Sequence, residues 1–490
     1  MKLLLAALFF TGLSIYAQNY DEIYRPQFHF TPPAHWMNDP NGLVYFNGKY
    51  HLFYQYYPEG TVWGPMHWGH ATSTDLMHWE QLPIALYPDK LGWIFSGSAV
   101  IDSQNTAGFG KNAMVAIFTY HNDEIWKAGQ KNTESQGLAY SLDEGKTWVK
   151  YEGNPVLNNS GEQDFRDPKV FWNSETRQWN MVLAVGDHIR IFSSSNLKKW
   201  NKESDFKPQN DLVNLGVWEC PDLFSLQTQD GTTKWVLIVN HGDKCPNGGS
   251  GTRYFIGDFD GKTFTPTQPS LWMDHGTDFY AAVTFANVPN NQRILLGWMS
   301  NWQYATKVPT DVWRSAMTLP RTLTLEKKND QFFIKQAFLP VIHDNQNELY
   351  KAIIAKLPFE RKRLDLSAAE VSFGTAAKDF KITLSNSANE QFVISLQSGV
   401  LTLDRSQSGQ VGFSDVFGPK IQTMSIAETA TSVQLLMDAA SIEILINDGS
   451  YSMTNLYFPI QPYSDIKIES ESASMLKNLE IKSLPSIWKN

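Results

Sequence analysis

The sequence has 490 residues, which suggests two or more domains, and 13% of the residues are aromatic, including 17 tryptophans. Its formal net charge at pH 7 is -9, and acidic and basic residues are interspersed without a block of lysine and arginine. This pattern argues against a nucleic-acid-binding or polybasic membrane surface and favours a neutral substrate; the flat aromatic side chains are typical of sugar-binding clefts.

Residues 1–17 are predicted to be a secretory signal peptide. Lys2 gives a basic start, an apolar run follows from Leu3 to Phe10, and Ala17 precedes the expected cleavage point. The apolar run is shorter than a bilayer-spanning helix requires, so we expect no membrane insertion. The chain is therefore predicted to be exported to the periplasm or the extracellular space.

Only two cysteines occur, Cys220 and Cys245. A single pair cannot form a disulfide framework, although one bond between the two stays open, and we expect Cys220 to be a small buried packing residue. No cluster of Cys and His has the spacing of a zinc site, and no loop matches the calcium-binding pattern. We therefore predict no metal site.

Residues 18–338 are predicted to form an all-β body, a five-bladed β-propeller. Short runs rich in Val, Ile, Phe, Tyr and Trp alternate with turns of Asn, Asp, Gly and Pro. Five cells of two apolar strands begin near Asn38, Phe95, Arg166, Glu219 and Asp278. In four of them a further strand, a turn and an aromatic follow, ending at Trp79, Trp148, Trp200 and Phe264. This repetition predicts five blades.

Three of the cells open with an acid next to a proline: Asn38-Asp39-Pro40, Arg166-Asp167-Pro168 and Glu219-Cys220-Pro221. Taken alone, the stretch around Asp39 could be an ordinary turn at the entrance to a hairpin over residues 43–55. Corresponding positions in propeller blades face one axial funnel, however, so we expect Asp39, Asp167 and Glu219 to converge.

Cleavage of a glycosidic bond requires two carboxyl groups beside the bond, one ionised and one protonated. Asp39 lies in a polar stretch and suits the ionised role. Glu219 lies between Trp218 and Cys220, in less polar surroundings that should raise its pKa and keep it protonated. Asp167 follows Arg166, which should stabilise its charge and suit it to binding sugar hydroxyls.

After residue 338 we expect a linker over residues 339–355, which could be helical, and a second all-β domain over residues 356–490. Alternating apolar and polar residues at 380–384 and 441–446 predict a two-sheet β-sandwich. We favour a supporting role for this domain over sugar binding or a dimer contact, because a fold alone does not give a function. The oligomeric state is left open.

Four motifs together resemble glycoside hydrolase family 32, the invertases, inulinases and levanases. They are Trp36–Gly42, Phe95–Ser98, Phe165–Pro168 and Trp218–Pro221, and the last domain adds Ser441–Ile444 and Asn447–Gly449. The resemblance implies a secreted, retaining hydrolase of β-D-fructofuranosides that needs no cofactor. It also implies that Asp39 is the nucleophile, Glu219 the acid/base, and Asp167 the transition-state stabiliser that acts with Arg166.

The resemblance further implies a fructosyl pocket, lined by Asn38, Gln55, Trp63, Phe95, Ser96, Tyr280 and Trp298. Other roles remain open for four of these residues. Gln55 and Ser96 could equally satisfy backbone groups at strand ends. Trp63 and Trp298 could belong to the core, where tryptophan is usually found.

The expected reaction is release of terminal fructosyl units from levan and inulin, with sucrose as a further substrate. Segments 248–255 and 298–304 resemble those of exo-acting enzymes, while an endo-acting enzyme and a non-catalytic fructan-binding propeller stay as alternatives. A five-bladed hydrolase of arabinans or xylans is disfavoured by the sequence at Trp36–Gly42. The preference for β-2,1 or β-2,6 linkages is left open.

Overall fold

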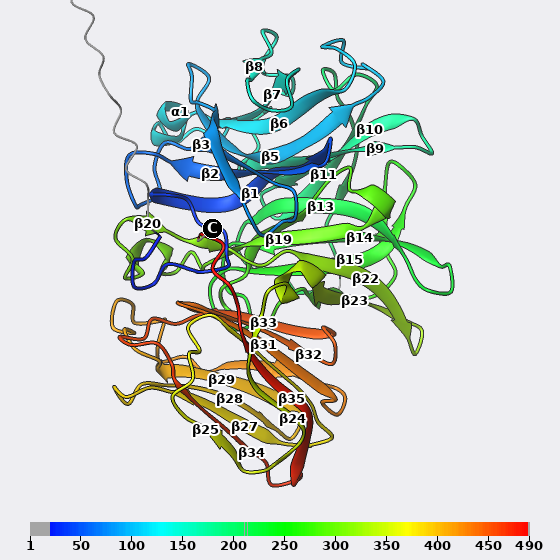
Figure 1. Ribbon diagram of the computed structural model, residues 1–490. Coiled ribbons are helices and arrows are strands. Elements are labelled where there is room, and N and C mark those ends of the chain that lie inside the picture. Colours follow the sequence, from blue (N-terminus) through cyan, green and yellow to red (C-terminus); the bar gives the residue numbers. More distant parts are fainter. Residues whose placement is uncertain (1–19, 210, 213, 489–490) are drawn as a thin grey trace, which may run out of the picture.

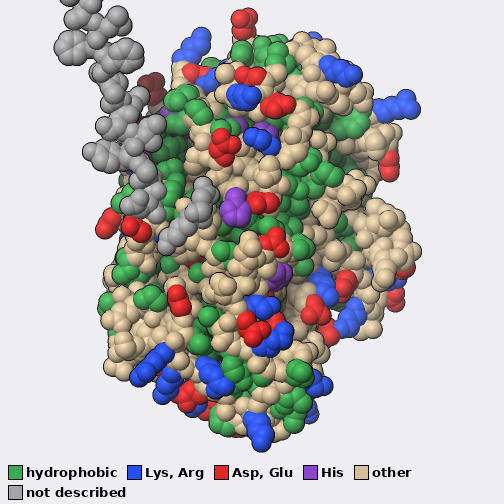
Figure 2. All heavy atoms as spheres, viewed as in Figure 1, with side chains coloured by type: hydrophobic (Ala, Val, Ile, Leu, Met, Phe, Trp, Pro, Cys, Tyr) green, Lys and Arg blue, Asp and Glu red, His purple; other side chains and the backbone are tan. Residues whose placement is uncertain are grey.

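The computed structural model describes residues 20–209, 211–212 and 214–488. A β-propeller and a β-sandwich stack against each other (Figure 1), which confirms the predicted fold class. The expected signal peptide lies outside the described residues. Within the described ranges, no helix is long and apolar enough to cross a membrane. Acidic and basic side chains are interspersed over the face shown in Figure 2, in agreement with the charge pattern of the sequence.

The propeller has five blades, and within each blade neighbouring strands are antiparallel, apart from one parallel addition to blade 1. Blade 1 contains β1 (His35–Phe46), β2 (Lys49–Tyr57), β3 (His67–Ser73), β4 (Glu80–Leu86) and the parallel β20 (Trp313–Arg314). Blade 2 contains β5 (Trp93–Asp102), β6 (Ala113–His121), β7 (Glu134–Ser141) and β8 (Val149–Lys150). Blade 3 contains β9 (Phe165–Asn173), β10 (Gln178–Val185), β11 (His188–Ser194) and β12 (Asn201–Phe206).

The last two blades have five strands each. Blade 4 contains β13 (Trp218–Gln227), β14 (Thr233–His241), β15 (Gly251–Phe259), β16 (Phe264–Pro266) and β17 (Leu271–Trp272). Blade 5 contains β18 (Tyr280–Thr284), β19 (Arg293–Met299), β21 (Ala316–Met317), β22 (Arg321–Lys328) and β23 (Gln331–Phe338). The helical segments are short: α1 (Asp123–Lys127) and the 3-10 turns η1 (Pro289–Asn291), η2 (Ala305–Lys307) and η3 (Pro340–His343).

The turn before the outer strand of several blades uses the same chemistry. Asp75 Oδ1 accepts hydrogen bonds from the backbone N–H groups of Met77 and His78, at 2.9 and 2.8 Å. Asn196 in blade 3 and Asp260 in blade 4 accept the equivalent pairs of backbone bonds. Asp and Asn side chains commonly organise turns in this way. The repeated turn residues seen in the sequence are therefore structural units of the blades.

The first strand of every blade contains a β-bulge at its start. In each case the first strand advances by three residues where the neighbouring strand advances by only two. These stretches of the first strands are 37–40, 94–97, 166–169, 219–222 and 280–283. A bulge bends its strand and redirects a side chain. All three predicted acids lie within these five short stretches, so the bulges determine where their carboxyl groups point.

The ring closes between blades 1 and 5. Tyr45 N donates to Ala286 O, and Ala286 N donates to Leu43 O, both at 2.9 Å. At the other end of β1, Trp313 and Arg314 of β20 pair with His35 and Trp36. This pairing extends β1 towards the N-terminus. Asp39 therefore lies inside β1 rather than at the entrance to a strand, and the alternative interpretation of this stretch as an ordinary turn is wrong.

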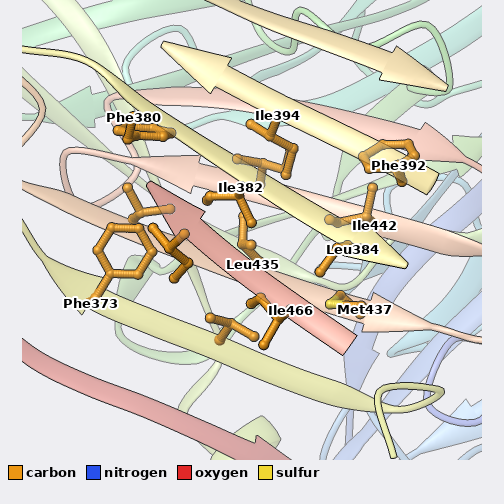
Figure 3. Close-up of a cluster of buried hydrophobic side chains, with 14 of the residues drawn as sticks. Phe373, Phe380, Ile382, Leu384, Phe392, Ile394, Leu435, Met437, Ile442 and Ile466 are labelled. Atoms are coloured by element: carbon orange, nitrogen blue, oxygen red, sulfur yellow. The ribbon is translucent and has the colours of Figure 1, made fainter. Parts of the chain in front are cut away.

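The sandwich has two six-stranded sheets. One sheet contains β24 (Asn347–Lys356), β35 (Met475–Ser483), β26 (Ala369–Gly374), β31 (Ser432–Asp438), β32 (Ser441–Ile446) and β33 (Tyr451–Leu456). The other contains β25 (Phe359–Arg361), β34 (Asp465–Glu469), β27 (Phe380–Ser385), β28 (Gln391–Gln397), β29 (Val400–Gln407) and β30 (Gln422–Ser425). Apolar side chains of both sheets meet in the core between them (Figure 3).

Two features of the sandwich differ from the expectation. The linker predicted over residues 339–355 is not a helical connector, because residues 347–356 form β24, which pairs with β35 in the sheet. In addition, every residue of β32 is buried rather than alternately exposed. The outward-facing Leu445 packs with Phe28, Leu319 and Phe338, so this face of the sheet is covered by the propeller and the N-terminal segment.

A buried ionic network joins the two domains. Glu443 of β32 accepts hydrogen bonds from His29 Nε2 at 2.8 Å and from Arg321 Nε at 3.0 Å, and Arg321 also pairs with Asp274 at 3.0 Å. His29 bonds Asp438 through Nδ1 at 2.7 Å. Burial alone would lower the pKa of His29, but these two carboxylates raise it to about 9. His29 is therefore charged at neutral pH, and every charge in the network has a partner of opposite sign.

We predict that Glu443→Ala lowers the free energy of unfolding of the full chain by about 3–5 kcal/mol, because removing one partner leaves Arg321 and His29 buried without compensation. Denaturant unfolding measures this loss. The control is Glu428→Ala, which breaks an exposed ion pair with Lys328 and should cost about 1 kcal/mol or less. Equal losses in the two variants would contradict the argument.

Candidate functional site

A cavity of about 480 Å³ opens where the first strands of the blades meet. Its lining includes all three predicted acids, with Arg166 and five other residues predicted for the site: Asn38, Gln55, Trp63, Phe95 and Ser96. The remaining two, Tyr280 and Trp298, are buried and pack with the cavity wall. Residues from all five blades thus reach one place, although the sequence separates them widely.

Asp39 is held by side chains from three blades. Its Oδ1 accepts from Asn38 Nδ2 at 2.9 Å, and its Oδ2 accepts from Ser96 Oγ at 2.7 Å and from the Cys220 thiol at 3.5 Å. Trp36 Nε1 donates to Asn38 Oδ1 at 2.8 Å, which turns the amide N–H group of Asn38 towards the acid. These bonds hold the Asp39 carboxylate in one orientation in the cavity.

Asp167 is buried, and its electrostatic setting differs from the expectation. Burial raises the pKa of its carboxyl to about 8; Arg166 opposes this rise, while the nearby Glu219 and Asp39 add to it. Arg166 lowers the pKa of Asp167, as expected, but the net shift is upward, which the sequence analysis did not predict. The guanidinium does not outweigh the loss of water and the repulsion from two other acids.

The backbone and thiol of Cys220 complete the surroundings of Asp167. Cys220 N donates to Asp167 Oδ2 at 2.9 Å, and the thiol lies 3.6 Å from the same oxygen. Both cysteines are free and buried, so no disulfide joins Cys220 to Cys245. Cys220 is a buried packing residue, as expected, but it also links two of the acids.

Glu219 accepts three hydrogen bonds from two side chains. Arg166 Nη2 and Nε donate to its Oε1 at 3.0 and 3.3 Å, and the Tyr280 hydroxyl donates to its Oε2. Burial raises the pKa of Glu219, with a further contribution from Asp39, and this rise exceeds the lowering effect of Arg166 and Tyr280. The predicted direction for Glu219 is therefore confirmed. Arg166 itself is shared among acids, since it also bonds Glu134 and Asp164.

The other expected residues divide between cavity and core. Gln55 donates to Ile94 O at 3.1 Å and so satisfies a backbone group, yet it also lines the cavity. Trp63 is 39% exposed and forms part of the cavity wall rather than the core, with its ring 5.9 Å from Phe95. Trp298 is fully buried, and its ring packs 4.8 Å from that of Trp302.

The sequence analysis did not identify several of the residues that line the cavity: Glu134, His121, Trp126, Asp164 and Trp302. Glu134 accepts from Phe165 N at 2.6 Å and from Arg166 at 3.1 Å, so it anchors the stretch that carries Asp167. No repeated motif surrounds Glu134. The one signal in the sequence that could have identified Glu134 is the predicted propeller, because a strand end next to a recognised motif is expected to face the same axial funnel as that motif.

The arrangement can support acid/base chemistry on a sugar. The three predicted acids share one cavity with the Arg166 guanidinium, and two of them, Asp167 and Glu219, have raised pKa values. One acid can therefore hold a proton while another is ionised, as cleavage of a glycosidic bond requires. Among the described residues, no group of His, Cys, Asp and Glu is placed to hold a metal ion.

Comparison with protein families gives two matches that together cover most of the chain. Residues 29–336 match the N-terminal domain of the glycosyl hydrolases family 32, and residues 341–483 match the C-terminal domain of that family. The sequence is 42% identical to a levanase of Bacillus subtilis (strain 168), an alignment that covers 100% of this chain and 74% of the relative. It is 37% identical to an extracellular exo-inulinase of Aspergillus niger, in an alignment that covers 96% of this chain and 97% of the relative.

Solved structures give similar matches. The exo-inulinase of Aspergillus awamori aligns with a TM-score of 0.86 and 35% identity, over 96% of this chain and 100% of that one. A variant fructofuranosidase of Schwanniomyces occidentalis, complexed with fructosylnystose, aligns with a TM-score of 0.84 and 32% identity, over 97% and 99%. Both domains and their relative placement are therefore shared with these proteins.

We predict that Tyr280→Phe raises the pKa of Glu219, because the Tyr280 hydroxyl stabilises the ionised carboxylate. If Glu219 acts as a proton donor, the alkaline limb of the kcat/KM profile should move to higher pH. The pH dependence of kcat/KM on sucrose measures this shift. Tyr120→Phe is the control, since Tyr120 bonds Asp89 at 3.0 Å away from the cavity. A limb that stays in place or moves to lower pH would contradict the prediction.

Proposed function

Because the chain belongs to glycosyl hydrolase family 32, we propose that it is an exported enzyme that releases terminal β-D-fructofuranosyl residues from levan and inulin, and from sucrose. The observation that carries this proposal is the meeting of Asp39, Asp167 and Glu219 in one cavity. The printed names of the relatives, a levanase and extracellular exo-inulinases, support the fructan substrates and the export.

In the proposed reaction Asp39 attacks the anomeric carbon of the terminal fructosyl unit. The bond from that carbon to the bridging oxygen breaks, and Glu219 gives its proton to the leaving oxygen. Water then gives a proton to Glu219, its oxygen bonds the anomeric carbon, and Asp39 is released, so the configuration is retained. The fixed carboxylate of Asp39 and the raised pKa of Glu219 support these two roles.

Asp167 is proposed to hold fructosyl hydroxyl groups and to stabilise the transition state together with Arg166. Its pKa of about 8 implies a protonated acid in the resting site at neutral pH, which relieves the repulsion among three carboxyl groups. As positive charge develops on the sugar, the oxygens of the Asp167 carboxyl group interact with it more favourably than with the neutral ground state. Its stabilising effect would therefore be greater in the transition state than in the ground state.

The shape of the site favours removal of single terminal units. Asp39 and Asp167 lie in the cavity, and the buried Trp298 and Tyr280 pack with its wall. A cavity of about 480 Å³ lies within the usual range for small-molecule pockets. A chain end can enter such a cavity, whereas an internal unit would need an opening on both sides.

We predict that Asp39→Asn and Glu219→Gln each reduce the release of fructose from inulin, levan and sucrose by about 10³-fold or more. The first variant loses its attacking group and the second its proton donor. Glu219→Gln should keep much more activity on a fructoside whose leaving group needs no proton, such as a nitrophenolate. Initial rates on both kinds of substrate measure this difference.

The control for these variants is Glu428→Gln, a change of an exposed acid outside the cavity. All three proteins should remain folded at the temperature of the assay, which circular dichroism checks. Near-normal release of fructose by either site variant would remove that residue from its proposed role.

The cutting mode is tested by product analysis with the parent enzyme. We predict that free fructose is the main product from levan and inulin at early times, because the cavity admits chain ends. Chromatography of the products separates the cases. A ladder of oligosaccharides would indicate an endo-acting enzyme, and no turnover of any fructoside would favour a fructan-binding propeller.

A further inference from the structure

An exposed tryptophan lies on the outer wall of the cavity. Trp126 of α1 is 59% exposed and lines the cavity, although tryptophan is usually buried. Its ring lies 6.4 Å from that of His121, which stacks on Phe95 at 4.3 Å. The rings of Phe95, His121 and Trp126 thus form a row that runs outwards from the cavity wall. The indole of Trp126 is the most exposed of the aromatic side chains that line the cavity.

The segment that carries Trp126 is well anchored. Asn122 N donates to Thr133 O at 2.8 Å and ties the two ends of the loop together. The Asn122 side chain accepts from Ile125 N at 3.1 Å, and Asp123 forms an ion pair with Lys127 at 2.6 Å. An exposed ring on a fixed backbone can bind a ligand without a large cost in chain ordering.

Polar groups accompany the ring. Gln130 and Lys131 of the same loop line the cavity, and both are exposed. A flat apolar ring beside amide and ammonium donors suits a sugar, which has an apolar face and a hydroxyl-bearing edge. The loop thus has the chemistry of a carbohydrate subsite.

The position of the loop indicates which part of the substrate it meets. The residue that follows the loop is Glu134, which bonds Arg166, and Arg166 bonds Glu219. The loop therefore stands on the same side as Glu219, the group proposed to protonate the leaving oxygen. The sugar next to that oxygen, and the chain beyond it, would extend along this wall.

We propose that Trp126, with Gln130 and Lys131, forms a leaving-group subsite that binds the fructan chain behind the terminal fructosyl unit. The inference rests on the proposed function and adds a chain-length preference to it. Trp126 stacks on a sugar unit of the leaving chain, while the fructosyl unit itself contacts the residues around Asp39. Substrates with a longer leaving group gain from this contact, and sucrose gains little.

The test compares Trp126→Ala with Trp126→Phe on sucrose and on short and long inulin and levan oligosaccharides. Loss of one stacking contact should lower kcat/KM by about three- to tenfold on the longer substrates, mainly through a higher KM. The value on sucrose should change by about twofold or less, and Trp126→Phe should recover most of the loss. Tyr87→Ala removes a ring that is 54% exposed and does not line the cavity. This control variant should leave kcat/KM unchanged for sucrose and for the longer substrates.

A binding measurement separates this inference from the proposed function. Calorimetry with the oligosaccharides on Asp39→Asn, with and without Trp126→Ala, reports affinity without turnover. Weaker binding of long oligosaccharides in the double variant supports the subsite even if the parent hydrolyses nothing, an outcome that would overturn only the proposed function. Equal losses on sucrose and long chains, or unchanged binding and kinetics throughout, would overturn the subsite.

Discussion

The site depends on one extra residue in the first strand of each blade. A regular strand would alternate its side chains between the two faces of a blade. The bulges at 37–40, 94–97, 166–169, 219–222 and 280–283 interrupt this alternation at equivalent places. In blades 3, 4 and 5 the bulge also holds a residue other than glycine at positive φ: Asp167, Cys220 and Ala281. Such backbone is costly and concentrates at functional sites, and here it places one side chain per blade in or beside a common cavity.

The same convergence creates an electrostatic problem that the surrounding charges only partly solve. Three carboxyl groups in a buried cavity repel one another, and Arg166 is divided among Glu219, Glu134 and Asp164. Burial is the main reason that the pKa values of Asp167 and Glu219 are raised, and repulsion from the neighbouring acids adds to the rise against the opposing effect of Arg166. Burial therefore favours the protonated form of these two carboxyl groups, which is what a general acid requires.

The sequence predicted the architecture well because the blades repeat. Five strand pairs and their Asp and Asn turns imply a propeller, and a propeller implies that Asp39, Asp167 and Glu219 meet. Burial could not be predicted in the same way, since it depends on all five blades at once. For this reason the sequence predicted the stabilising effect of Arg166 on Asp167 but not the net rise in the pKa of that acid. Trp126 and Glu134 belong to no repeated motif, and β24 was misread because its partner, β35, lies at the far end of the chain.

The sandwich contributes to the site through blade 5, although it lies outside the cavity. The segment that leads into β18 is bonded to this domain at several points: Asp274 accepts from Thr454 N and Oγ1, both at 2.8 Å. Asp278 accepts from Arg405 Nη1 at 2.8 Å, and Asp278 N donates to Thr454 O at 3.1 Å. Tyr280, two residues further on, is the residue whose hydroxyl donates to Glu219. The second domain thus fixes the strand that supplies a partner of the acid, which gives its supporting role a direct connection to the chemistry.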